Sequence, residues 1–160
     1  MSALKNIVAL FCFLAFTAIS FAQKLKPVIK SAAVQKFKPP KLKTVLGSRS
    51  DSSAVSVDEA VQLVTLPLTI TDDKKTSYTI ASYQCMYKRK AVTENEETGK
   101  VSPTSSMVAD VFKTTPLPEI WKKIISEQLK PGEEIFFFDV VVKDAQGRLM
   151  FAPNLKLVIQ

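Results

Sequence analysis

The sequence contains no histidine, only two cysteines and only four glycines in 160 residues. Without histidine, the chain has no Ser-His-Asp or Cys-His nucleophile system, no imidazole base and no histidine ligand for zinc. No two glycines lie close enough together to form a phosphate-binding loop. We therefore predict a protein that is not an enzyme, with no catalytic residue, no cofactor and no resident metal.

The first 22 residues have the pattern of an export signal. Lys5 provides a short positive region, residues 7–16 are almost wholly apolar, and Ser20-Phe21-Ala22 resembles a small-x-small cleavage site. Two hydroxyl residues interrupt the apolar stretch, which is shorter than a membrane-spanning helix requires. We predict a cleaved signal peptide over 1–22, with a retained anchor as the alternative, and a periplasmic or secreted protein.

Positive charge is concentrated in residues 23–50, which carry eight lysines and arginines and no acidic residue. Prolines and mutually repelling charges disfavour helix and sheet, so we predict a disordered basic linker over 23–57. Its candidate polyanion-binding residues are Lys24, Lys26, Lys30, Lys36, Lys38, Lys41 and Lys43. The linker holds one aromatic residue, Phe37, and so no stacking platform for bases; we expect no specific nucleic-acid partner.

Residues 58–160 have the pattern of a single β domain. Strands are predicted over 60–70, 77–88, 107–112, 134–143, 148–151 and 154–159, with a polar loop over 88–105 and one helix over 118–129. One helix cannot cover a sheet of this size. We therefore predict a mainly β fold, a small immunoglobulin-like sandwich with one α-helix, and an open antiparallel sheet as the alternative. Cys85 is predicted to be a small, half-buried and unreactive side chain on the second strand, with an intermolecular disulfide as the alternative.

The strand over 134–143 is apolar on both of its faces. Strict alternation places Phe136, Phe138, Val140 and Val142 in the core, and Ile135, Phe137, Asp139 and Val141 on the opposite face. A second apolar face in so small a domain favours contact with a partner. We predict that Phe137, Asp139 and Val141 bind a partner, together with Arg148 of the following turn; Asp139 as an ordinary surface or edge residue is the alternative.

Several groups of residues between Ser82 and Ile159 follow the order of a known protein family. They are Ser82-Tyr83-Gln84 with Tyr87-Lys88-Arg89-Lys90, Phe112-Lys113 before a helix ending Gln128-Leu129, Ile135-Phe136-Phe137-Phe138-Asp139-Val140 after Gly132, and Lys143-Asp144-Ala145-Gln146-Gly147-Arg148 before Asn154-Leu155-Lys156-Leu157. With these landmarks, about half of the chain resembles the C-terminal domain of the GldM family of gliding-motility proteins.

The resemblance implies a small β-rich periplasmic module of the type IX secretion and gliding apparatus of the Bacteroidota. Proteins of that family have a membrane helix and several β domains, dimerise, and couple an inner-membrane motor to outer-membrane partners. This chain has one predicted domain behind an export signal. The implied function is therefore that of a free-standing binding module with envelope protein partners, and a homodimer is a further option.

The sequence is also compatible with two other functions. An exported polyanion-binding protein would use the basic residues of 23–50, through contact with an acidic membrane surface or another polyanion. A secreted hydrolase inhibitor would present an exposed loop, such as 92–104, to its target enzyme. Protection of that loop by a partner would favour the inhibitor, whereas salt-dependent binding through the basic residues would favour the first alternative.

Overall fold

The computed structural model describes residues 37–160. The predicted signal peptide and the lysines from Lys24 to Lys36 lie outside the described residues. The helices are α2 (Val57–Leu63) and α3 (Glu119–Gln128). The strands are β1 (Leu42–Leu46), β2 (Arg49–Ser50), β3 (Ser52–Val55), β4 (Leu68–Asp72), β5 (Ser77–Glu94), β6 (Val101–Phe112), β7 (Glu134–Lys143), β8 (Leu149–Ala152) and β9 (Leu155–Ile159).

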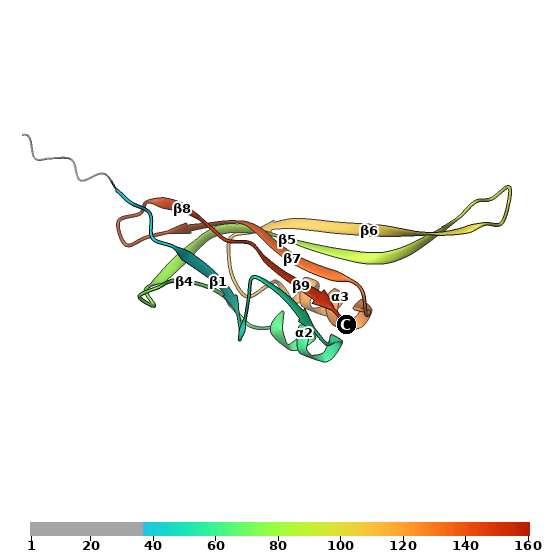
Figure 1. Cartoon of the computed structure of the whole chain (residues 1–160), viewed down its shortest axis with the longest axis horizontal. Helices are drawn as coiled ribbons and strands as arrows, with labels where there is room; N and C mark the ends of the chain where they lie inside the picture. Colours follow the sequence, from blue (N-terminus) through green and yellow to red (C-terminus); the bar gives the residue numbers. More distant parts are fainter. Residues whose placement is uncertain (1–36) are drawn as a thin grey trace, which may run out of the picture. The chain divides into compact units, whose positions relative to one another are not determined.

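The strands form two sections of sheet that share strand β5 (Figure 1). The first residues of β5 pair with β4, which continues to β1 and β2. The rest of β5 pairs with β6 on one side and β7 on the other, and β7 continues to β8, β9 and β3. Buried side chains from both sections belong to one hydrophobic core. This arrangement confirms the prediction of a mainly β, sandwich-like fold, with two helices in the described residues where one was predicted.

The prediction of a disordered linker is wrong for residues 42–57. Strand β1 pairs with β4 over its whole length, β3 pairs in parallel with β9, and α2 begins at Val57. Leu46 and Val55 are almost fully buried, whereas Lys43 points to solvent. The folded domain therefore begins about sixteen residues before residue 58. Side chains alternate between the two faces of β1, so Leu46 is buried while Lys43 stays hydrated on the other face.

Helix α2 occupies the first half of the segment that was predicted to be a strand over 60–70. Its N-cap is Ser56, whose hydroxyl accepts a hydrogen bond from the Glu59 N–H at 3.2 Å. Asp58 and Glu59 lie in the first turn, where negative charge favours the helix dipole. The prediction of a strand is correct only after Pro67, where β4 begins.

Helix α3 is the predicted helix over 118–129 to within one residue at each end. Trp121 and Ile125 from its apolar stripe are buried. The Trp121 ring meets Phe112 edge-to-face at 5.4 Å and 84°. This contact anchors the C-terminal end of β6 to the core.

The predicted polar loop over 88–105 is instead most of a long hairpin. Strands β5 and β6 pair without interruption from Tyr83↔Phe112 to Glu94↔Val101, whereas β5 pairs with β7 only as far as Lys88. Residues 89–106, hereafter the arm, are therefore a two-stranded ribbon that projects beyond the rest of the sheet (Figure 1). The polar composition indicated exposure correctly, but exposure on both faces is compatible with a ribbon as well as with a loop.

Candidate interaction surface

Strand β7 contains a β-bulge at Asp139 that reverses its inward face. Gln84 pairs with Phe138, but Ser82 pairs with Val141, so β7 advances by three residues where β5 advances by two. Ile135 and Phe137 are buried before the bulge, and Val140 and Val142 after it. The extra residue is the reason for this pattern, because it shifts the alternation by one position.

Phe137 is therefore not a surface residue, and its predicted contact with a partner is wrong. Its side chain is 1% exposed and lies 6.1 Å from the Tyr83 ring. The aromatic residues that reach the surface of β7 are Phe136 and Phe138, whose rings stack at 5.2 Å. Val141 stays on the surface as predicted, since it follows the bulge.

Asp139 has left-handed backbone geometry, with φ at 47°. Aspartate tolerates this conformation better than most residues. Its carboxylate accepts a hydrogen bond from Gln84 Nε2 at 2.8 Å, across the sheet from the bulge. The predicted surface position of Asp139 is confirmed, and its local role is to form the bulge that exposes Phe138 and Val141.

Replacing Asp139 with valine is expected to lower the free energy of unfolding by about 1–2 kcal/mol, because a β-branched residue is strained at positive φ. Asp139→Gly should cost less than about 0.5 kcal/mol, because glycine adopts this conformation freely. Urea denaturation of both variants measures the difference. Equal losses in the two variants would show that the side chain of Asp139, rather than its backbone conformation, determines its contribution to the free energy of unfolding.

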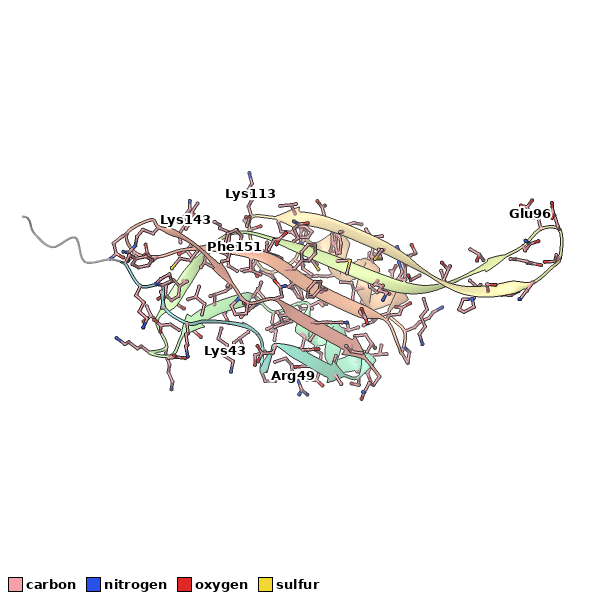
Figure 2. All side chains as sticks on the ribbon, turned by 45° about the horizontal axis from the view of Figure 1, so that its top comes forward. Lys43, Arg49, Glu96, Lys113, Lys143 and Phe151 are labelled. Carbon is pink, nitrogen blue, oxygen red and sulfur yellow. The ribbon has the colours of Figure 1, made fainter. Side chains whose placement is uncertain are left out.

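One surface of the β5–β9 section, hereafter the outer face, carries a group of apolar side chains. Residues directly opposite each other on antiparallel strands share a face, and the pairs Met86↔Phe136 and Val141↔Phe151 join three strands in this way. The outer face consists of Met86, Met107, Val111, Phe136, Phe138, Val141, Leu149 and Phe151. Phe151 is 77% exposed and Leu149 is 62% exposed. Figure 2 shows Phe151 on β8, near Lys143 at the end of β7.

Charged side chains border this apolar group at one end. Glu134 forms ion pairs with Lys156 at 3.0 Å and with Lys88 at 3.6 Å. The hydrogen bond from Lys156 lowers the pKa of the Glu134 carboxyl, and Lys88 lowers it further. An apolar centre with a charged rim is the usual composition of a protein–protein interface.

Arg148 lies in the turn between β7 and β8, beside the outer face. Its guanidinium forms an ion pair with Asp144 at 2.6 Å, and Asp144 also accepts the N–H groups of Gln146 and Arg148. This network shapes the turn that presents Leu149 and Phe151. Of the four predicted partner-binding residues, Asp139, Val141 and Arg148 thus lie at the surface around β7 and β8.

The structure describes three of the seven candidate polyanion-binding lysines: Lys38, Lys41 and Lys43, all exposed. A shallow hollow of about 410 Å³ is lined by Lys38, Lys41 and Lys74, but also by Asp72 and Asp73. Because charges of both signs meet there, this hollow offers no strong field for an anion. The polyanion alternative stays a prediction.

Cys85 is fully buried in the core, and burial raises the pKa of its thiol. Within residues 37–160, no three His, Cys, Asp or Glu side chains are grouped so that they could hold a metal ion. No helix in this part of the chain is long and apolar enough to cross a membrane. No protein-family model matches the chain, and no curated protein sequence matches it either.

Sequence reasoning missed Phe136, Phe138 and Phe151, the aromatic residues of the outer face. For Phe151, the sequence offered no signal of exposure, because β8 is apolar at all four positions and only its burial in the structure distinguishes one face from the other. For Phe136 and Phe138, the one indication of an irregular strand was the acidic residue that interrupts an apolar run, since aspartate tolerates the positive φ that Asp139 adopts at this bulge.

Proposed function

We propose that this chain is a non-enzymatic, exported module that binds a protein of the bacterial envelope through its outer face. The observation that carries the proposal is the continuous group of apolar side chains on β5–β8, in which Met107, Leu149 and Phe151 are exposed and Phe138 is half-buried. Contiguous apolar patches on a protein surface mark interaction sites, and aromatic residues dominate the energy of protein interfaces.

The kind of partner follows from the resemblance to the GldM C-terminal domain together with the pattern of an export signal. Both favour an envelope component linked to gliding motility or type IX secretion. The outer face is apolar, and Glu134 forms ion pairs with Lys88 and Lys156 at its border. This arrangement supports a folded protein surface as the partner, because a membrane surface or polyanion would favour a cluster of basic residues instead.

The test is to cross-link the tagged full-length chain in its native cells and to identify the captured proteins by mass spectrometry. Phe151→Asp is expected to reduce capture of the partner at least tenfold, because a charge replaces an apolar contact in the desolvated interface. The matched control is Ile120→Asp, which changes a residue on α3 that is 62% exposed and lies off the outer face. This control should capture as much partner as the unmodified chain.

Equal capture by Phe151→Asp and the unmodified chain would refute the outer face as the binding surface. Cross-links confined to lysines 24–43, with lipid or nucleic acid as the only captured material, would transfer the function to the basic segment. Cross-links confined to residues 92–104 and a hydrolase would favour the inhibitor.

A further inference from the structure

Strand β6 is an open edge of the sheet. It pairs with β5 alone, and every residue from Val101 to Val111 is exposed. No other described segment covers it, and Figure 1 shows it along the upper border of the sheet. The unpaired N–H and C=O groups of such an edge are a template for another strand, and most proteins protect them.

The pairing of the hairpin shows which backbone groups face outward. The Asn95 N–H donates to the Lys100 carbonyl at 3.0 Å, which makes these two residues a hydrogen-bonded pair. Bonded and non-bonded pairs alternate along an antiparallel ladder, and the register is unbroken up to Phe112. The odd-numbered residues of β6 therefore direct their backbone groups away from β5. The hydrogen bond of Val111, an odd-numbered residue, is consistent with this assignment, because its N–H donates to Asp110 Oδ1 at 2.7 Å.

Two positions on this edge are blocked. Pro103 is an odd-numbered residue without an N–H, and the Val111 N–H is already occupied by the Asp110 carboxylate. Between them, Ser105, Met107 and Ala109 retain outward donors. Pro103 lies four residues before Met107 and Val111 four residues after it, so the open part of the edge is symmetric about Met107.

We propose that two copies of this chain pair antiparallel through β6, with the two-fold axis at Met107. In this register Ser105 of one copy faces Ala109 of the other, and all three outward donors of each strand are used. Pro103 faces Val111 of the other copy, so the positions that cannot bond lie opposite each other. An unrelated strand could use the same donors, but the symmetry of the blocked positions fits a copy of the same strand.

The side chains are compatible with this pairing. Between Pro103 and Val111 the strand has one charged residue, Asp110, and it would face Thr104 of the other copy rather than another charge. Met107 and Val111 belong to the outer face, so pairing would join the two outer faces into one surface. The dimer does not depend on the proposed partner in the envelope.

Sedimentation equilibrium of the purified full-length chain tests the proposal through charge at the axis. Met107→Lys places two lysines next to each other and should raise the dimer dissociation constant at least tenfold. Leu149→Lys is the matched control, because Leu149 has the same exposed fraction as Met107, 62%, but lies on β8; this variant should dimerise like the unmodified chain.

Mixing Met107→Lys with Met107→Glu should restore the dimer as a mixed species, while each variant alone dimerises at least tenfold more weakly than the unmodified chain. Only a surface with residue 107 at its symmetry axis gives this result. A chain that is monomeric at every concentration up to its solubility limit would overturn the proposal, as would a dimer that Met107→Lys leaves unchanged. The effect of Phe151→Asp on capture of an envelope protein is measured in the separate cross-linking experiment. The dimer and the envelope partner can therefore be refuted independently of each other.

Discussion

Replacing Phe137 with alanine is expected to lower the free energy of unfolding by about 3–5 kcal/mol. The side chain is 1% exposed, and β7 places it between Cys85 on β5 and Leu155 on β9. Removing it would leave a cavity between these strands and the Tyr83 ring, because a close-packed core relaxes only in part. Urea denaturation followed by far-UV circular dichroism measures the loss.

Phe138→Ala is the matched control for this prediction. It removes the same side chain one position further along the strand, but from the outer face, and should cost less than about 1.5 kcal/mol. The order of the two effects is opposite to the one that strict alternation predicts for this strand. A larger loss for Phe138 than for Phe137 would show that the bulge at Asp139 is absent and that Phe137 faces solvent.

The inversion on β7 shows how far alternation can be read from a sequence. Val140 and Val142 were correctly predicted to be buried, and Ile135 and Phe137 were wrongly placed on the surface. A strand that is apolar at nearly every position contains no signal that selects one face over the other. The bulge that selects it depends on a backbone conformation of Asp139 and on pairing with β5, and neither is a property of the strand alone.

The elements that were predicted best are those with local causes. Helix α3 has a proline at its start, an acidic first turn and an apolar stripe, all of which act within a few residues. Strand β1 was not recognised because its stabilisation comes from pairing with β4, more than twenty residues away, while Lys43 and the basic residues around the strand suggested disorder.

The interaction surface could be predicted only in part for the same reason. Asp139, Val141 and Arg148 follow one another along the chain, so a sequence reading placed them together. Met86, Phe136 and Phe151 come from three strands whose register determines that they share one face. Register depends on bulges and turn geometry, which a sequence indicates weakly.

The second large effect is expected at Glu133, a buried carboxylate between α3 and β7. Its side chain accepts hydrogen bonds from the Tyr87 hydroxyl at 2.5 Å, the Lys130 N–H at 3.0 Å and the Lys90 N–H at 3.2 Å. The residue is 3% exposed. It therefore fastens the loop after α3 to the base of the arm, where β5 leaves its pairing with β7.

Glu133→Ala is expected to lower the free energy of unfolding by about 3–5 kcal/mol, because it leaves three donors at a buried site without their acceptor. Glu133→Gln should cost about 1–2 kcal/mol, since the amide oxygen still accepts hydrogen bonds while the charge is lost. Hydrogen exchange of the Lys90 amide should accelerate in Glu133→Ala beyond the change in global stability, because the base of the arm loses its attachment.

Tyr87→Phe separates the hydroxyl contact from the two backbone contacts. Burial raises the pKa of Tyr87, and the hydrogen bond to Glu133 raises it further. The stabilisation by this neutral hydroxyl is complete below the ordinary tyrosine pKa of 10.0 and is lost as the pH rises through the raised value. Tyr87→Phe should therefore reduce the alkaline loss of stability while keeping the Lys90 amide protected. If Tyr87→Phe and Glu133→Ala instead expose that amide equally, the backbone contacts of Glu133 do not hold the arm.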